Sequence, residues 1–317
     1  MKVKLAIQMD AISAIDIKGD TTFALALEAQ ARGYEIFYYE PDHLRMAVGT
    51  DDKVEIIAAL APLKVQDVVG AHYELGAASP TDLRTMDVVL MRQDPPFDMA
   101  YIAATHFLEK IHPETLVVNA PFAVRNAPEK LWVLDYPDLT PPTLLSRDRH
   151  AITAFRARHK DIILKPIFGN GGAGIFRVQA GDENFGALLD MFLAGTREPF
   201  IAQAYLPAIR AGDKRLILID GEAAGALNRV PQAGEARANV HIGGVPEAVA
   251  LDERDYEIAA RIGPALRDVG IILAGVDIIG GLVTEVNVTS PTCIREIKAL
   301  GGVDLAVAVW DAIEKKL

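Results

Sequence analysis

The stretch from Asp277 to Glu296 reads Asp-Ile-Ile-Gly-Gly-Leu-Val-Thr-Glu-Val-Asn-Val-Thr-Ser-Pro-Thr-Cys-Ile-Arg-Glu and predicts two β-strands that meet at a glycine pair. Glu285 and Asn287 lie two residues apart in a β-branched run, so their side chains point to the same face of a strand. Asp277 offers a third oxygen ligand from the preceding strand. Oxygen donors of this kind suit Mg²⁺, which binds through a few protein ligands together with substrate phosphates. The stretch therefore predicts a site for Mg²⁺, or alternatively Mn²⁺, formed by Asp277, Glu285 and Asn287.

The geometry of the glycine pair decides whether these three ligands meet. A plain two-residue hairpin loop at Gly280-Gly281 would place Asp277 opposite Thr284, facing away from Glu285. An odd-length loop or a β-bulge would bring all three oxygens to one face. We predict an odd-length loop or a bulge. The alternative is an ordinary hairpin whose charges lie on its solvated side.

Size and composition limit the classes of protein that fit. The chain has 317 residues, of which 50% are hydrophobic, so two or three lobes are expected. Its 32 basic and 43 acidic side chains give a net charge of −11, which argues against a nucleic-acid partner. No apolar run approaches the roughly 18 residues of a membrane span, and Asp10 comes too early for a signal peptide. A single cysteine, Cys293, excludes an internal disulfide, so a cytoplasmic protein without a membrane partner is expected.

The first 122 residues are expected to form an open α/β domain, because strand and helix signals alternate along them. The expected strands are Val3–Met9, Glu35–Tyr39, Met86–Met91 and Thr115–Asn119, and the expected helices are Asp20–Arg32 and Met99–Lys110. Ligands of such sheets bind beyond the carboxyl ends of the strands. The loops at residues 10–20 and 92–98 are expected at that edge.

The rest of the chain is expected to form two α+β lobes, a central one at residues 123–200 and a C-terminal one at residues 201–317. The first of these segments contains an expected helix at Asp148–His159, strands at Asp161–Lys165 and Ile175–Gln179, and a helix at Asp182–Leu193. From Phe200 onward the expected strands are Phe200–Ala204, Arg215–Asp220, Glu222–Val230, Leu273–Ile279 and Leu282–Val288, with helices at Asp252–Val269 and Asp304–Lys316. This order of elements suggests lobes that grip a ligand between them.

A glycine-rich segment and two lysines suggest a phosphate site. Residues 169–174, Gly-Asn-Gly-Gly-Ala-Gly, match the dinucleotide fingerprint formally, but a strand follows where that fingerprint requires a helix. The segment better fits a flexible hairpin whose backbone N–H groups fold over phosphates, with a simple turn as the alternative. Lys165 ends the preceding apolar strand and is costly to bury without an anion. Lys130 is a weaker candidate, with a solvated helix charge as its alternative.

The C-terminal lobe contains several arginines that suit an anion site, since guanidinium groups fit carboxylates and phosphates. They are Arg215, Arg229, Arg237 and Arg295. Any one of these arginines, taken alone, is about as likely to have a structural role as to bind an anion. Residues 232–244, which include Arg237 and His241, form a long glycine-bearing loop typical of a mobile lid.

Two further features bear on chemistry. Residues 203–207, Gln-Ala-Tyr-Leu-Pro, close a strand and offer backbone groups that suit an adenine edge, although a plain strand end is the simpler interpretation. Cys293 opens a helix, where a thiol can be polarised, but a catalytic role is not expected of it. No Ser-His-Asp arrangement is recognisable.

Taken together, these segments resemble the ATP-grasp ligases and, among them, the prokaryotic glutathione synthetase family. The resemblance spans essentially the whole chain. It is carried by Asp16-Ile17-Lys18 with Asp20, Arg92 with residues 94–98, Glu129-Lys130-Leu131, Ile163-Leu164-Lys165-Pro166, Gly171-Gly172, residues 203–207, Gly212-Asp213-Lys214-Arg215 and residues 285–296. The last block is highly specific, because D-alanine–D-alanine ligases share its Glu-x-Asn but usually continue toward Pro-Gly.

The resemblance implies an ATP-grasp fold with an N-terminal open α/β domain, and a role for each matching residue. Lys130 and Lys165 would contact the phosphates of ATP, the co-substrate, beneath Gly171 and Gly172; Gln203, Tyr205 and Leu206 would line the adenine pocket, with Asp213 near the ribose. Asp277, Glu285 and Asn287 would hold two Mg²⁺ ions. Arg215, Arg229, Arg237 and Asn239 would bind γ-glutamylcysteine or stabilise an acyl-phosphate, and Arg92, Asp94, Ser290 and Arg295 would lie on the substrate side.

The implied activity is the ATP-dependent joining of γ-glutamylcysteine and glycine to glutathione through an acyl-phosphate, by a homo-oligomer, commonly a tetramer. Two alternatives stay open: another ATP-grasp carboxylate–amine ligase, and a regulatory protein that binds ATP without ligation. The sequence also departs from the family pattern. Gln93 stands where a basic residue is common, and Ala204, Ala233 and Ala238 stand where Asn or Gly is common.

Overall fold

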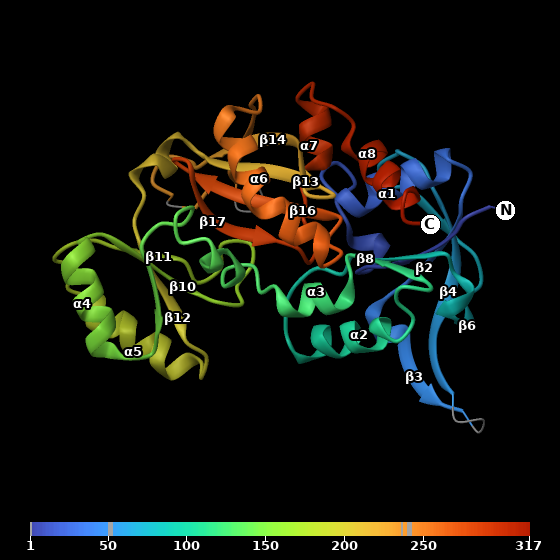
Figure 1. Cartoon of the computed structure of the whole chain (residues 1–317), viewed down its shortest axis with the longest axis horizontal. Helices are drawn as coiled ribbons and strands as arrows, with labels where there is room; N and C mark the ends of the chain where they lie inside the picture. Colours follow the sequence, from blue (N-terminus) through green and yellow to red (C-terminus); the bar gives the residue numbers. More distant parts are fainter. Residues whose placement is uncertain (1, 50–52, 236, 240–242) are drawn as a thin grey trace.

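The computed structural model describes residues 2–49, 53–235, 237–239 and 243–317. Its strands form three sheets along the chain, and Figure 1 shows the lobe with helices α4 and α5 standing apart from the rest. The expectation about His241 and part of that about the loop 232–244 lie outside the described residues. None of the described helices is both long and apolar enough to span a bilayer.

The first sheet builds the N-terminal domain and has the strand order β3-β4-β2-β1-β7-β8. Its parallel strands are β1 (Lys4–Gln8), β2 (Glu35–Tyr39), β7 (Val88–Met91) and β8 (Leu116–Val118). Alternate residues of β1 face opposite sides, so Leu5 and Ile7 pack toward α1 (Thr21–Ala31), whereas Ala6 packs toward α2 (Met99–Glu109). Helices on both faces confirm the predicted open α/β domain.

Four strands lie between β2 and β7, where the alternation of strand and helix signals predicts none. They are β3 (Leu44–Val48), β4 (Val54–Val65), β5 (Tyr73–Leu75) and β6 (Ser79–Asp82). The long strand β4 pairs antiparallel with the other three and with β2. Three alanines and a proline interrupt its β-branched residues, so its conformation depends on these partners.

The central sheet is antiparallel, with the order β11-β10-β12-β9. It contains β9 (Thr143–Ser146), β10 (Ile162–Pro166), β11 (Phe176–Val178) and β12 (Phe200–Ala204), and one face packs against α4 (Arg149–His159) and α5 (Phe185–Gly195). The boundary predicted between residues 200 and 201 falls inside β12. Because β12 pairs with both β10 and β9, the central lobe extends at least to Ala204.

The C-terminal sheet is antiparallel and has the order β15-β14-β13-β16-β17. Its strands are β13 (Asp213–Ile219), β14 (Glu222–Val230), β15 (Val245–Ala248), β16 (Leu273–Ile279) and β17 (Leu282–Asn287). Helix α6 (Glu253–Asp268) packs on one face, and α7 (Ile294–Ala299) and α8 (Leu305–Glu314) pack on the other. Shorter helices are α3 (Pro121–Asn126), η1 (Ile12–Ala14), η2 (Pro41–His43), η3 (Leu83–Thr85), η4 (Trp132–Asp135) and η5 (Pro207–Ala211).

The hydrophobic cores show which parts of the chain pack as one body. Two large clusters each combine residues of the N-terminal domain with residues of the C-terminal sheet, whereas the central lobe has a cluster of its own. Asn119 joins the first two parts directly. Its amide group donates to the carbonyls of Leu273 and Val288, both at 2.8 Å, and accepts from the N–H groups of Ile272 and Leu273 at 2.9 and 3.0 Å.

The β16–β17 hairpin has the predicted bulge. Gly280 and Gly281 form a two-residue loop with φ values of +59° and +80°, but the register shifts between Ile278 and Asp277, so that Asp277 lies opposite Glu285. Thr284 is the extra residue on β17. The bulge therefore corrects the register that a plain two-residue loop would impose, and Asp277 and Glu285 share one face.

Candidate active site

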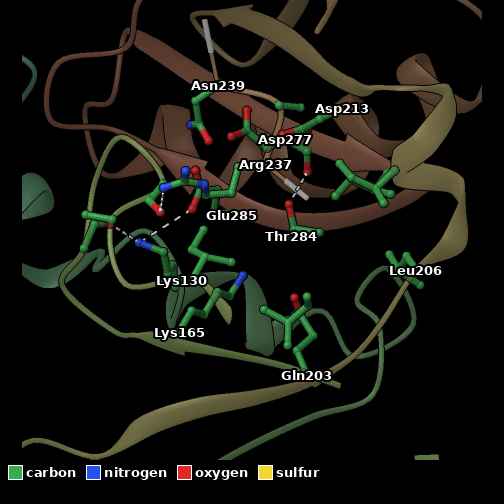
Figure 2. A pocket seen from close by; sticks show the side chains of 18 of the residues that line it. Lys130, Lys165, Gln203, Leu206, Asp213, Arg237, Asn239, Asp277, Thr284 and Glu285 are labelled. Carbon is green, nitrogen blue, oxygen red and sulfur yellow. Dashed lines mark hydrogen bonds and ion pairs between the residues drawn. The ribbon is translucent and has the colours of Figure 1, made fainter. Parts of the chain in front are cut away.

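Two cavities meet between the lobes. The first lies between the central and C-terminal sheets, and Figure 2 shows it from close by. Its lining includes Lys130, Lys165, Gly171, Gly172, Gln203, Tyr205, Leu206, Asp213, Arg237, Asn239, Asp277 and Glu285. The second cavity is bordered by the N-terminal domain and includes Arg92, Asp94, Arg215, Arg229, Asn287 and Ser290 in its lining. Glu285, Asn239 and the glycine segment line both cavities, so ligands in the two would meet there.

The two lysines occupy one end of the first cavity. Lys165 is buried, and burial lowers the pKa of its ammonium group while the carboxylate of Glu285 opposes that change. No hydrogen bond or ion pair holds its side chain within the described part of the chain, so an anion would be a fitting partner. The ammonium of Lys130 donates to the backbone carbonyls of Ile167 and Gly169 and lies 3.6 Å from a carboxylate oxygen of Glu285.

The glycine segment connects β10 to β11, so it joins two antiparallel strands, and the hairpin interpretation is confirmed over the dinucleotide one. Gly171 and Gly172 have φ values of +59° and +81°, which favour glycine over any other residue. A Cβ atom at Gly169 would lie 2.7 Å from the ring of Pro166. The segment can therefore fold closely over the cavity, with backbone N–H groups available to a phosphate.

Figure 2 shows Gln203 and Leu206 across the cavity from Lys130, and Tyr205 also lines this cavity. The amide of Gln203 donates to the hydroxyl of Thr143 at 2.9 Å, which fixes its orientation. This end has no lysine or arginine in its lining among the described residues, in contrast to the end with Lys130 and Lys165. The cavity is therefore polarised, with a cationic end and an uncharged end.

Two buried aspartates and two buried arginines form a cluster on β13, β14 and β16. Arg215 binds both carboxylate oxygens of Asp277, at 2.5 and 2.9 Å, and Arg229 lies 3.0 Å from Asp277 and 2.7 Å from Asp213. Burial opposes ionisation of Asp277, but the two guanidinium groups outweigh it and lower its pKa. For Asp213 burial dominates and raises the pKa. Asp213 was expected near a ribose, and its ion pair with Arg229 gives it a second role in holding this cluster.

Gly275 makes this cluster possible, although its sequence context carries no signal for it. It lies on β16 opposite Asn287, and a Cβ atom there would lie 2.9 Å from Cδ of Arg215. The absence of a side chain lets the guanidinium group lie flat across the sheet toward Asp277.

Glu285 and Asn287 fit a divalent cation. The amide nitrogen of Asn287 donates to the carbonyl of Gly275 at 3.2 Å and to a carboxylate oxygen of Glu285 at 3.5 Å, and both side chains border the second cavity. Asp277 lies on the same face, but both its oxygens serve the arginines. Among the described residues no group of three or more His, Cys, Asp or Glu side chains is arranged to hold a metal. A small protein ligand set suits Mg²⁺ bound jointly with substrate phosphates.

Most of the expected substrate-side residues line the second cavity, where they also form hydrogen bonds with other parts of the protein. Arg92 is buried and donates to the hydroxyl of Thr22 and the carbonyl of Pro291, both at 3.0 Å. Ser290 donates to the carbonyl of Arg92 at 3.2 Å, and the N–H of Asp94 donates to Asp10 at 2.7 Å. These contacts tie the 92–98 loop to the segment after β17.

Arg295 does not join the other candidates. Its guanidinium group pairs with Asp67 at 2.8 Å and lies over the ring of Phe23, and it lines neither cavity. Gln93 is likewise turned away, since it is buried and accepts a hydrogen bond from Gln8. The structure thus gives Arg295 a role in joining α7 to the N-terminal domain, and Gln93 a role inside that domain.

Sequence reasoning missed Glu129, whose carboxylate borders the second cavity. One oxygen accepts from the hydroxyl of Thr289 at 2.8 Å and from the N–H groups of Val288 and Thr289 at 3.3 and 3.4 Å. Burial, and then the charge of Glu285, raise the pKa of Glu129. Its place directly before Lys130 in the chain is the signal that could have found it.

Arg237 and Cys293 complete the set of candidates. The backbone and guanidinium groups of Arg237 bind Glu235, and the guanidinium also reaches the carbonyl of Gly172 at 3.3 Å, so the 232–244 loop touches the glycine segment. Cys293 is buried, and burial raises the pKa of its thiol. A neutral thiol agrees with the expectation that Cys293 is not a nucleophile.

The three-sheet architecture with this site between its lobes is the ATP-grasp fold. Solved structures with the same fold include D-cycloserine synthetase DcsG, with a TM-score of 0.69 and 16% identity over 99% of this chain and 100% of that one. The ATP-grasp ligase PsnB has a TM-score of 0.62 and 19% identity over 100% of both chains.

The chain belongs to the prokaryotic glutathione synthetase family. The models of that family's N-terminal domain and ATP-grasp domain match residues 3–125 and 129–302. The glutathione synthetase of Brucella melitensis is 55% identical over 100% of both chains, and that of Pseudomonas putida is 45% identical over 100% of this chain and 99% of its own length. The chain is therefore an ATP-dependent carbon–nitrogen ligase, and its activity is the synthesis of glutathione.

Proposed function

We propose that the first cavity binds ATP and the second binds γ-glutamylcysteine and glycine, and that the reaction occurs where the cavities meet. The observation that carries this proposal is the set of residues common to both linings: Glu285, Asn239 and the glycine segment. The cationic end with Lys130 and Lys165 suits the phosphates. The uncharged end at Gln203, Tyr205 and Leu206 suits the adenine.

The chemistry has two steps. A carboxylate oxygen of the cysteinyl group attacks the terminal phosphorus of ATP, the bond to ADP breaks, and an acyl-phosphate forms. The amine of glycine then attacks the acyl carbon, loses a proton and expels phosphate from a tetrahedral intermediate, which leaves the new peptide bond. Positioning and charge stabilisation account for most of the catalysis that the protein supplies to such transfers. Lys130, Lys165, Arg215 and Arg229 are the cations that border this path.

We assign the metal site to Glu285 and Asn287, with Asp277 as a third ligand that would keep its ion pairs with Arg215 and Arg229. Bound there, Mg²⁺ or Mn²⁺ would offset the negative charge of the phosphates. The protein's own contribution is to orient the ligands: Gly275 holds the amide of Asn287, and Arg215 and Arg229 keep Asp277 ionised.

The 232–244 loop acts as a lid over the reaction. Its contact between Arg237 and the carbonyl of Gly172 links the lid to the glycine segment, so both can close together over the phosphates. Asn239 would then face the acyl-phosphate from the lid side. Excluding water matters because an acyl-phosphate hydrolyses readily.

The wider setting follows the family resemblance: a cytoplasmic homo-oligomer, with a tetramer as the expected state, that binds only small molecules. We divide the chain into an N-terminal domain at residues 1–122, a central lobe that ends with β12, and a C-terminal lobe. The 92–98 loop and Ser290 belong to the peptide side of the site in this arrangement, whereas Arg295 supports it from outside the cavities.

The test is to measure ADP and peptide product together, with ATP, Mg²⁺, γ-glutamylcysteine and glycine, omitting each in turn. Equal amounts of ADP and glutathione, with all four required, support the proposal. If the enzyme prefers D-alanine or glutamate to glycine as the acceptor, the second cavity has been assigned to the wrong substrate. ATP binding without turnover on any acceptor would overturn the proposed chemistry.

A further inference from the structure

Residues 204–206, at the uncharged end of the first cavity, include one backbone N–H group without a hydrogen-bond partner among the described residues. The N–H of Ala204 donates to the carbonyl of Pro142 at 2.9 Å, and that of Tyr205 donates to the carbonyl of Asp161 at 3.0 Å. Within the part of the chain that the structure describes, the N–H of Leu206 has no such partner, and Leu206 lines the cavity. The direction of that free donor depends on how the chain turns at Tyr205.

Arg177 and Asp161 hold Tyr205 from two sides. Arg177 lies on β11 opposite Ile163, on the face of the sheet that borders the cavity, and its guanidinium carbon lies 3.8 Å from the centre of the Tyr205 ring. The same guanidinium binds the carboxylate of Asp161 at 2.5 Å, and that carboxylate also accepts from the N–H of Ala180 at 3.0 Å. Asp161 therefore makes two contacts that hold Tyr205. The backbone carbonyl of Asp161 accepts from the N–H of Tyr205, and the carboxylate of Asp161 binds Arg177, which stacks on the Tyr205 ring.

We infer that Arg177 is a positioning residue for the base of ATP, acting through Tyr205. It is absent from the lining of the first cavity, so it is not expected to touch the nucleotide. Its stacking fixes the ring of Tyr205, and this fixes the turn that presents the Leu206 N–H. The inference rests on the proposed binding of adenine at this end. It goes beyond that proposal because it states that a residue outside the cavity affects how tightly the base of ATP binds.

The contacts predict an effect that is confined to the base. A guanidinium stacked closely on an aromatic ring is attracted to the face of that ring. Losing the stack together with the Asp161 pair is expected to weaken ATP binding about tenfold, which corresponds to about 1.4 kcal/mol. Binding of a ligand that has phosphates but no base should not change, because Lys130, Lys165 and the glycine segment are untouched.

The experiment compares two ligands on the full-length protein with Mg²⁺: ATP and inorganic tripolyphosphate, each by equilibrium titration. Arg177→Met removes the cation but keeps an apolar stem, and Arg177→Lys restores a cation near the ring and the carboxylate. Arg156→Met is the matched control. Arg156 stacks on the ring of Phe185 at 4.4 Å in the same lobe and donates to the carbonyl of Gln179 at 2.7 Å, but it lies outside the lining of either cavity.

We expect Arg177→Met to raise the Kd of ATP about tenfold and leave the Kd of tripolyphosphate within twofold, with Arg177→Lys in between and Arg156→Met like the wild type. Equal weakening of both ligands would mean a general loss of the lobe and would overturn the inference, as would a Kd of ATP within twofold of the wild type in Arg177→Met. If wild-type protein binds tripolyphosphate as tightly as ATP, the base site itself has been misplaced and the proposed function fails at that point. The two failures are therefore distinguishable.

Discussion

Replacing Asn119 by leucine should cost the protein a large part of its stability, because one side chain carries four buried hydrogen bonds between two parts of the chain. The substitution keeps a side chain of similar size, so little cavity forms. It leaves the N–H groups of Ile272 and Leu273 and the carbonyls of Leu273 and Val288 without their partner. A buried polar group that loses its partner costs about 1 to 3 kcal/mol. If the two N–H groups each lose their full contribution and the two carbonyls lose part of theirs, the free energy of unfolding should fall by about 4 kcal/mol.

Urea unfolding is a suitable assay, because the two tryptophans report on different cores. Trp310 is fully buried among residues of the α1 and α8 side, and Trp132 packs against the other cluster. Asn126→Leu is the matched control, since the amide of Asn126 is exposed and makes one hydrogen bond, to the carbonyl of Phe122 at 2.8 Å. A loss below about 1 kcal/mol in Asn119→Leu, or a loss equal to that of Asn126→Leu, would refute the reasoning.

Three further outcomes are expected. Glu285→Gln should lower turnover at least tenfold at limiting Mg²⁺ and less at high Mg²⁺, since it removes one charge from the metal site; unchanged turnover at limiting metal would contradict the assignment. Arg237→Ala should keep ATP binding but release more ADP than glutathione, because the lid loses its contact with Gly172; equal yields would count against a water-excluding lid. The pKa of Glu129 is raised from its ordinary value of 4.5, so the free energy of unfolding should fall as pH rises above 4.5 through that raised pKa. In urea unfolding, the free energy of unfolding of Glu129→Gln should depend less steeply on pH. Identical pH dependences in the variant and the wild type would exclude Glu129 as the titrating group.

Local patterns sufficed to predict the elements that form the walls of the site. Asp20 and Asp98 cap α1 and α2 as short polar residues before apolar helical runs usually do. Strands β2, β12 and β14 begin and end at the predicted residues, because a glycine or proline lies within three residues of each of their ends. Strand β4 was not predicted, since three alanines and a proline interrupt its apolar run and its conformation depends on pairing with β2, β3, β5 and β6.

The sequence by itself determined which chemical groups are available: the oxygen ligands Glu285 and Asn287 on one strand face, Lys165 at the end of an apolar strand, and a glycine segment between two strands. Periodicity and turn chemistry are local, so they can be recognised without knowing the fold. Only the tertiary structure decided what those groups contact.

Asp277 and Arg215 are 62 residues apart in sequence, and their pairing depends on the register of β13 against β16 and on the missing side chain of Gly275. Arg295 turned toward Asp67 rather than into the cavity for the same kind of reason, because a partner 228 residues away competes for the guanidinium group. The bulge at Thr284, by contrast, could be anticipated as one of two local options, and packing of the hairpin selected it. Long-range contacts choose between states that local sequence leaves close in energy, and here they set the directions of Asp277, Arg215 and Arg295.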